Sequence, residues 1–352
     1  MRRPTVFAIS LLALLGSLNG CGGGDSASPG PVVVPAPTPA PSPSPSPSPS
    51  PSPSPTASGR ADLPLTAGRV LAEPLRGLTV ETLAQSDALF EAISAHARAP
   101  TVRLVFQQGE PPSTYQAIVQ RLRPRAFVIG ELVDSDAMAG MSATQVRERA
   151  AAYFAAIGSD VDLWEIGNEL NGEWVGSGPA AINAKLDAAY DVIVRQHHAP
   201  AMITLNYWSG PDCYAKSWEP TLSFARTIPA EIREGTSYLA LSIYETACSP
   251  RQQPSATEIA SMLTELGTLF PKARLLIGEI GAQGKADGFP EPDLAEKQRI
   301  ARRYMGMHGE LARLVGPRFV GGYFWWYYAD DAVPRDRPGS LWPTLDELFT
   351  TM

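Results

Sequence analysis

The sequence of 352 residues has little cysteine, no excess of positive charge and no long apolar run beyond its N-terminus. Its three cysteines are too few for a disulfide scaffold or a four-cysteine zinc site. A formal net charge of −7 argues against nucleic acid as the main partner. After the first twenty residues, no apolar run reaches the roughly 18 residues of a membrane span. These absences favour a protein stabilised by an ordinary hydrophobic core.

The first twenty residues have the pattern of an export signal. A positive start, Met1-Arg2-Arg3, precedes an apolar segment (6–15) that is too short to span a membrane. The sequence Leu-Asn-Gly-Cys that ends at Cys21 resembles a bacterial lipobox, whose cysteine is lipidated and becomes the first mature residue. We therefore expect a lipoprotein signal peptide over residues 1–20; the alternative is an ordinary secretory signal with an incidental cysteine. Glycine rather than aspartate follows the cysteine, which by resemblance to lipoprotein sorting favours the outer membrane.

Proline is concentrated in the segment that follows, residues 21–60. Residues 26–59 carry no charged side chain, and proline alternates with serine from Pro41 to Pro55. Because every second residue there lacks an amide N–H, neither helix nor sheet can form, and we expect a disordered, extended stalk of about 3.1 Å per residue. A flexible linker with no required length is equally compatible. Either form would hold the following domain off a membrane, in the cell envelope outside the cytoplasm.

From about residue 70, short apolar segments alternate eight times with longer amphipathic ones. This alternation predicts an α/β fold, a (β/α)8 or TIM barrel, forming one domain over residues 61–352. An open doubly wound sheet is the alternative, but no glycine-rich phosphate turn follows the first segment. The predicted strands are Arg76–Val80, Thr101–Phe106, Ala126–Gly130, Val161–Gly167, Met202–Asn206, Tyr238–Ile243, Arg274–Gly278 and Phe319–Trp326. The predicted helices are Ser86–Ala97, Ser142–Ile157, Pro179–His197, Ser255–Phe270 and Pro292–Leu314.

Two glutamates directly follow predicted strands. Glu169 comes after the fourth strand, in WEIGNELNGEW, and Glu279 after the seventh, in LLIGEIGAQG. The strand ends of such a barrel build its catalytic face, and a lone buried carboxylate is unfavourable, so the two indicate a convergent pair. Glycosidic cleavage needs one acid to protonate the leaving oxygen and one carboxylate to attack or stabilise the anomeric carbon. Two ordinary rim carboxylates paired with arginines are the alternative.

These motifs resemble those of clan A glycoside hydrolases, the 4/7 superfamily of retaining β-glycosidases, and most closely the cellulase-type enzymes of family 5. The resemblance covers about residues 70–350. It implies that Glu169 is the general acid/base with a raised pKa, and that Glu279 is the nucleophile. Arg103 and Tyr244 would then keep the nucleophile ionised. Retention requires the two carboxyl groups to be about 5–5.5 Å apart.

The resemblance also implies contacts with the sugar. Asn168 would bond the sugar 2-hydroxyl, and the clan usually places a sugar-stacking tryptophan where Trp325 and Trp326 end the eighth strand. The fifth strand ends at Asn206 and Tyr207, where family 5 usually has a histidine; the third strand lacks its histidine too. We expect these two residues to contact substrate as well, because flat aromatic faces suit sugar rings; packing of the loop against the barrel is the alternative. No cofactor or metal is implied.

Two cysteines, Cys213 and Cys248, follow the fifth and sixth predicted strands, so their loops are neighbours on the predicted catalytic face. In an exported protein we expect a disulfide between them, closing a loop of about 35 residues. Two independent thiols are the alternative.

The sequence as a whole predicts a lipid-anchored, monomeric retaining glycoside hydrolase that acts on an extracytoplasmic β-linked glycan. A transglycosylase would use the same residues and differ only in the acceptor of the glycosyl group. A non-catalytic carbohydrate-binding envelope lipoprotein would keep the cleft but lack Glu169 or Glu279, and this sequence has both. Glucan, mannan, xylan and galactan all stay open as substrates, as do endo and exo action.

Overall fold

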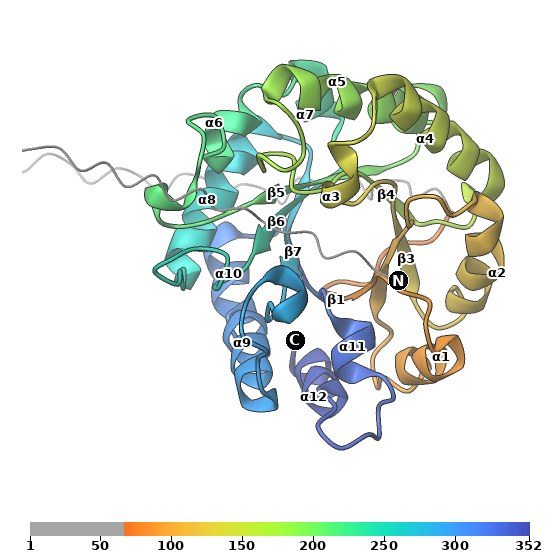
Figure 1. Ribbon diagram of the computed structural model, residues 1–352, viewed down its shortest axis with the longest axis vertical. Helices are drawn as coiled ribbons and strands as arrows, with labels where there is room; N and C mark the ends of the chain where they lie inside the picture. Colours follow the sequence, from red (N-terminus) through yellow and green to blue (C-terminus); the bar gives the residue numbers. More distant parts are fainter. Residues whose placement is uncertain (1–66) are drawn as a thin grey trace, which may run out of the picture. The chain divides into compact units, whose positions relative to one another are not determined.

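The computed structural model describes residues 67–352, which contain a closed barrel of eight parallel strands in sequential order (Figure 1). The TIM-barrel fold predicted from the alternation is therefore confirmed. The predicted signal peptide, Cys21 and the proline-rich linker lie outside the described residues. The strands are β1 (Leu75–Val80), β2 (Thr101–Val105), β3 (Phe127–Glu131), β4 (Leu163–Gly167), β5 (Ala201–Asn206), β6 (Tyr238–Ile243), β7 (Arg274–Ile280) and β8 (Phe319–Trp325).

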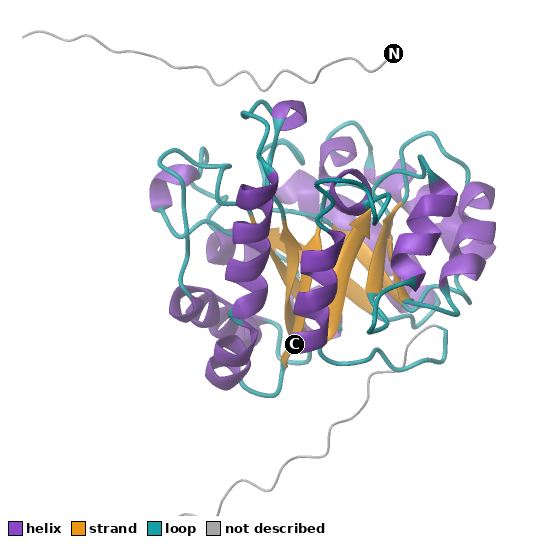
Figure 2. Ribbon diagram, turned by 90° about the horizontal axis from the view of Figure 1, so that it is seen from below, coloured by secondary structure: helices purple, strands orange, loops and turns teal. Residues whose placement is uncertain are grey.

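Helices surround the barrel and cover the outward faces of its strands (Figure 2). The helices are α1 (Ser86–Ser94), α2 (Pro112–Leu122), α3 (Ser135–Met138), α4 (Ala143–Ile157), α5 (Pro179–Tyr190), α6 (Thr221–Ala225), α7 (Ala230–Gly235), α8 (Ala256–Leu269), α9 (Leu294–Gly306), α10 (His308–Val315), α11 (Tyr328–Ala332) and α12 (Trp342–Thr351). Shorter turns are the π-helical η1 (Asp191–Gln196), which continues α5, and the 3₁₀ turns η2 (Pro211–Cys213) and η3 (Lys285–Asp287). Within residues 67–352, no helix has the length and apolar character needed to cross a bilayer.

All five predicted helices are present, but one is divided. The segment predicted over 292–314 forms α9 and α10, because Met307 between them has a ψ of −4° and interrupts the helical ladder. The start predicted at Ser142 is confirmed: its hydroxyl accepts from the amide of Gln145 at 3.2 Å, and the Gln145 side chain accepts from the Ser142 amide at 2.8 Å. Such a reciprocal cap stabilises a helix start by about 1 kcal/mol.

The barrel interior has an apolar layer and, towards the C-terminal ends of the strands, a polar layer. Because side chains alternate across each strand, every second residue points inward. The inward apolar residues pack together in one cluster: Leu75, Ile129, Leu163, Met202, Tyr238, Ala240, Leu276, Val320 and Phe324. Towards the C-terminal ends of the strands, the buried side chains become polar: Arg103, Glu131, Glu165, Thr204, Ser242 and Glu279. The polar layer therefore lies where TIM barrels place their active sites.

Irregular pairing on both sides of β7 sets the register of that polar layer. Between β6 and β7 the pairing shifts after Leu241, so that Ser242 lies opposite Glu279. Between β7 and β8 it shifts again near Ile277, opposite Gly322, which has a φ of +102°. Only glycine adopts such a backbone conformation without strain. A Cβ at Gly322 would also meet the Ile277 carbonyl oxygen well inside van der Waals contact.

We expect Gly322→Ala to lower the free energy of unfolding by about 2 kcal/mol or more, because both the positive φ and the backbone contact oppose a side chain. Gly309 in α10 is a matched control: its φ is not positive, and a Cβ there meets nothing within 4 Å. Gly309→Ala should be neutral or stabilise by up to about 1 kcal/mol. Urea unfolding followed by circular dichroism measures both; equal stability of the two variants would contradict this account of the β7–β8 register.

Candidate active site

One guanidinium lies at the centre of the polar layer. Arg103 on β2 is fully buried, and its Nη1 lies 2.6 Å from Oε1 of Glu279. Its Nε lies 2.5 Å from Oε2 of Glu165 and 3.0 Å from Oε2 of Glu131. Burial by itself lowers the pKa of Arg103, but the three carboxyl groups outweigh it and raise that pKa well above its ordinary value. Three strands, β3, β4 and β7, are thereby tied to one cation.

The carboxyl groups around Arg103 outnumber the charge it can balance. Burial raises the pKa of Glu131 well above its ordinary value and that of Glu165 to about 7, although Arg103 opposes both shifts. A buried carboxyl group in this position keeps its proton rather than add uncompensated charge. Burial therefore favours the protonated form of Glu131, while Nε of Arg103, 3.0 Å from its Oε2, favours the ionised form.

Glu279, at the end of β7, is 2% exposed and has donors at both carboxylate oxygens. Arg103 faces Oε1, while Oε2 accepts from the Tyr244 hydroxyl at 3.0 Å and lies 3.3 Å from the Ser242 hydroxyl. Burial is the largest cause, and the nearby charge of Glu279 the second, that raises the pKa of Tyr244 well above its ordinary value. Its hydroxyl therefore stays a donor. One cation and neutral hydroxyls thus stabilise a negative charge on this carboxylate.

Glu169, just past β4, is 9% exposed and has a φ of +46°. This left-handed conformation costs on the order of 1–3 kcal/mol for a residue with a side chain, and it often occurs at functional sites. Here it accompanies a side chain whose Oε1 accepts from the Ser242 hydroxyl at 2.5 Å and whose Oε2 accepts from Ser135 at 3.3 Å. The pKa of Glu169 is raised to about 8; burial is the largest cause, and the charge of Glu279 is the second largest.

Ser242 on β6 lies between the two glutamates. Its Oγ is 2.5 Å from Oε1 of Glu169 and 3.3 Å from Oε2 of Glu279, so these two oxygens are at most about 5.8 Å apart. Pairs of carboxyl groups in inverting glycosidases are about 6.5–9.5 Å apart, to leave room for a water, whereas retaining enzymes have about 5–5.5 Å. The upper limit set by Ser242 therefore fits direct attack by one carboxylate.

Further polar atoms at this end of the barrel have no partner in the protein. Asn168 donates from Nδ2 to Oε1 of Glu131 at 3.0 Å, which leaves its buried Oδ1 unbonded. Oδ1 of Asn206 and Nε1 of Trp208 are likewise buried and unbonded. A buried polar atom without a partner costs about 1–3 kcal/mol, so these three atoms would gain from ligand hydroxyl groups. Asn168 precedes Glu169 in the chain and bonds Glu131 in the polar layer; its predicted contact with a sugar stays a prediction.

Two predicted substrate contacts, Tyr207 and Trp325, instead lie in the hydrophobic core. The alternation of side chains explains both corrections, because each is the outward-facing neighbour of an inward residue. Trp325 is fully buried and donates from Nε1 to Asp331 at 2.9 Å. Trp326, the next residue, lies half-buried over Arg103, with its ring centre 5.2 Å from the guanidinium carbon. Of the two tryptophans, only Trp326 therefore borders the polar layer.

The disulfide predicted between Cys213 and Cys248 is confirmed. Its Cα atoms are 5.4 Å apart, and it joins the loop after β5 to the loop after β6. In contrast, the contacts of Ser242, Ser135 and Glu165 were not predicted from the sequence. For Ser242 and Glu165 a signal was present, since each is a polar residue at an inward position of an otherwise apolar strand. Ser135 is the first residue of the short helix α3 after β3 and had no such signal.

Comparison with known proteins supports the fold. The chain matches no protein-family model, and no curated protein sequence matches it. Among solved structures, a glucosidase from Croceicoccus marinus aligns with a TM-score of 0.52 and 14% identity, over 82% of this chain and 70% of that one. A family 1 β-glucosidase from Thermotoga maritima aligns with a TM-score of 0.51 and 11% identity, over 73% of this chain and 80% of that one. At such identities the likeness establishes the barrel fold.

Among residues 67–352, no three or more histidine, cysteine, aspartate or glutamate side chains form a group that could hold a metal ion.

We expect Ser242→Ala to raise the pKa of Glu169, because the lost hydroxyl bond favours the ionised form. A bond to a charged group is worth about 1.5–3 kcal/mol, so the titration should move up by about one pH unit or more. Carbon-detected NMR of protein labelled in the glutamate carboxyl groups measures it. The matched control is Ser340→Ala, a buried serine that donates to the Ala332 carbonyl. An unchanged pKa of Glu169 in Ser242→Ala would contradict the hydrogen bond from Ser242 to Glu169.

Proposed function

We propose that this protein is a retaining glycoside hydrolase that cleaves β-glycosidic bonds with Glu169 as acid/base and Glu279 as nucleophile. The observation that carries the proposal is the contrast between two carboxyl groups on either side of Ser242. One has a pKa raised to about 8, and the other is paired with Arg103 at 2.6 Å. Two carboxyl groups whose environments separate their protonation states are typical of an acid and a base at one site.

In the first step, Glu169 gives its proton to the leaving glycosidic oxygen while Glu279 attacks the anomeric carbon. The bond between the anomeric carbon and that oxygen breaks, the aglycone leaves as an alcohol, and an ester to Glu279 forms. Arg103 and Tyr244 hold the carboxylate in place before attack. The transition state resembles an oxocarbenium ion, which the approaching carboxylate of Glu279 stabilises.

In the second step, Glu169 takes a proton from water, and the water oxygen attacks the anomeric carbon to release Glu279. The same residue changes from acid to base because the charge on Glu279, which helps raise the pKa of Glu169, is absent in the ester. Two inversions at the anomeric carbon give net retention. If a second sugar replaced water, the same residues would perform transglycosylation.

Substrate contacts come from the unbonded polar atoms and from Trp326. Oδ1 of Asn168 would accept from a sugar hydroxyl beside the catalytic pair, as the resemblance to clan A implies for the 2-hydroxyl. Asn206 offers a second buried acceptor, and the half-buried ring of Trp326 offers an apolar face. Both glutamates and their partners are in place, which favours an enzyme over a non-catalytic carbohydrate-binding protein.

We further propose that the enzyme works as a monomer in the cell envelope, on a glycan outside the cytoplasm. The support is the lipoprotein-type signal that ends at Cys21 and the proline-rich segment behind it. The disulfide between Cys213 and Cys248 agrees, since disulfides persist in oxidising compartments. A diacylated cysteine gives a stable anchor, because each buried methylene contributes about 0.8 kcal/mol.

A covalent label tests the nucleophile. The full-length protein is incubated with 2-deoxy-2-fluoro β-glycosides of the gluco, manno, xylo and galacto series, each carrying an activated leaving group, and digested for mass spectrometry. We expect one sugar to form an ester with Glu279, and Glu279→Gln to form none. Glu169→Gln should still be labelled but should release the sugar about 10²–10⁴ times more slowly. An adduct on any other residue, or inversion of configuration in the product, would overturn the mechanism.

A pH profile tests the acid. Because Glu169 must be protonated to start the reaction and has a pKa of about 8, kcat/KM should fall as the pH rises through about 8. Ser242→Ala should move this alkaline limb to higher pH, in the direction expected for the pKa of Glu169. Initial rates between pH 5 and 10, on the sugar that labels Glu279, measure the alkaline limb in wild type and in Ser242→Ala. An alkaline limb that does not move in Ser242→Ala would assign it to another group.

A further inference from the structure

A cavity of about 500 Å³ opens between the loops that follow β6 and β7. It lies outside the polar layer that contains the two glutamates. Its volume falls within the range of about 300–1,000 Å³ typical of small-molecule sites. The side chains and backbone that line it are Thr246, Cys248, Ser249, Arg251, Ala282, Gln283, Phe289, Pro290, Glu291, Pro292, Glu296 and Ile300. None of these residues has a part in the two catalytic steps.

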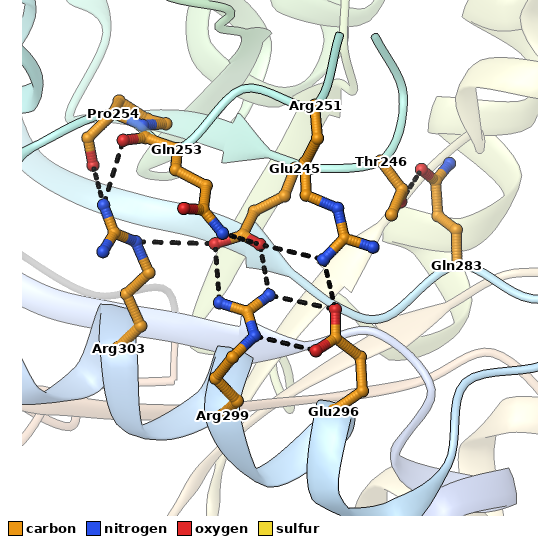
Figure 3. A network of polar contacts seen from close by, with 9 residues as sticks. All are labelled: Glu245, Thr246, Arg251, Gln253, Pro254, Gln283, Glu296, Arg299 and Arg303. Atoms are coloured by element: carbon orange, nitrogen blue, oxygen red, sulfur yellow. Dashed lines mark hydrogen bonds and ion pairs between the residues drawn. The ribbon is translucent and has the colours of Figure 1, made fainter. Parts of the chain in front are cut away.

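The walls combine flat apolar surfaces with uncharged polar groups. Phe289, which is half-buried, stands beside the prolines Pro290 and Pro292. Thr246 and Gln283 form a polar part of the wall, and their side chains bond each other at 2.8 Å (Figure 3). A sugar ring presents the complementary surfaces, with carbon-bound hydrogens on its faces and hydroxyls around its edge. Aromatic side chains stack on such faces, and side-chain amides and hydroxyls bond the edges.

Charges in the wall are balanced within the protein. Arg251 forms an ion pair with Glu296, and Arg299 on α9 bonds the same carboxylate (Figure 3). A sulfate or carboxylate on a ligand would therefore have to compete with a protein carboxylate for each of these guanidinium groups. The cavity thus favours an uncharged ligand.

The cavity is held rigid by the elements behind it. Glu245, only 1% exposed, lies between Arg299 and Arg303 of α9 and accepts from Gln253 at 3.1 Å (Figure 3). The disulfide joins Cys248, a lining residue, to the loop after β5. Walls fixed before a ligand arrives lower the entropy lost on binding.

The cavity is close along the chain to both catalytic strands. Thr246 follows Tyr244, the donor to Glu279, by two residues, and Gln283 follows Glu279 by four. The turn that presents Phe289 is also tied to the end of β8, because Asp287 accepts from the Tyr327 hydroxyl at 2.8 Å. Each residue of an extended chain spans at most about 3.6 Å, so the four residues from Glu279 to Gln283 place the Gln283 backbone within about 15 Å of the Glu279 backbone.

We propose that this cavity is a second carbohydrate site, which binds a neutral sugar residue of the same glycan whose bond is cleaved at Glu279. The inference rests on the proposed function and makes it more specific: the substrate is an uncharged oligosaccharide or polysaccharide rather than a single glycoside. Phe289 supplies the stacking face, and Thr246 and Gln283 supply hydrogen bonds to hydroxyls. Chain length is then recognised by a part of the protein separate from the catalytic pair.

The test compares chain lengths in wild type and Phe289→Ala. Initial rates are measured on the dimers and hexamers of β-linked glucose, mannose, xylose and galactose. We expect wild type to prefer the hexamer of one series, and Phe289→Ala to reduce the hexamer-to-dimer ratio of kcat/KM by about 10-fold, the effect of one lost stacking contact. The matched control is Phe154→Ala, a half-buried aromatic that stacks on His197 in another part of the barrel. It should keep the wild-type ratio.

A binding measurement separates this inference from the catalytic proposal. Calorimetric titration of Glu279→Gln with the same hexamers reports affinity without turnover, and adding Phe289→Ala should weaken it about 10-fold. Loss of that affinity supports the second site whether or not the enzyme turns over. An unchanged ratio and unchanged affinity in Phe289→Ala, or no binding of any neutral hexamer by Glu279→Gln, would overturn it. Failure of Glu279 to form a sugar ester would instead count against the catalytic proposal alone.

Discussion

A single buried guanidinium organises the catalytic end of this barrel. Arg103 is the cation that contacts three carboxyl groups, contributed by β3, β4 and β7. Without it, three acids in an apolar surrounding would all be driven to the neutral form. With it, one unit of positive charge is available, and its three carboxyl neighbours have different surroundings. Burial raises the pKa of Glu131 well above its ordinary value, while Glu279 faces Nη1 of Arg103 at 2.6 Å and accepts from the Tyr244 hydroxyl. If Glu279 is the nucleophile, as proposed, its ionisation therefore depends on how one positive charge is shared among three carboxyl groups.

Ser242 connects this ionic cluster to Glu169, the proposed proton donor. Its hydroxyl has one hydrogen and two carboxyl neighbours, so it can favour only one of them at a time. The short contact is with Glu169, which is not among the ion-pair partners of Arg103 and has a pKa raised to about 8. In the proposed mechanism the charge on Glu279 is lost in a covalent bond, and its Coulomb contribution to this raised pKa then ends. The proposed change of Glu169 from acid to base thus follows from the short distance between the two groups.

Much of this could be predicted from the sequence, and the failures have physical causes. Eight apolar segments and two glutamates after the fourth and seventh were enough for the fold and the proposed pair, because burial and the position of βα loops are readable from pattern. Helix α2 was missed, although Tyr115, Val119 and Leu122 have helical spacing on its buried face. Trp325 was placed with Trp326 because one residue decides which side of a strand a side chain takes. The register shift that sets Ser242 opposite Glu279 depends on pairing between strands, which no local pattern encodes.

The same alternation explains why chemistry and support lie together at the end of β6. Ser242 and Tyr244 point towards Glu279, whereas Glu245, the next residue, is bonded to the arginines of α9. Thr246 then bonds Gln283, which lies four residues beyond the nucleophile. Successive residues of one segment thus contact Glu279, anchor the loop to the outer helix and build a wall of the cavity. Because the segment is held at three points, the spacing between the cavity and Glu279 is set by covalent geometry and a few bonds, as the proposed recognition of an extended chain would require.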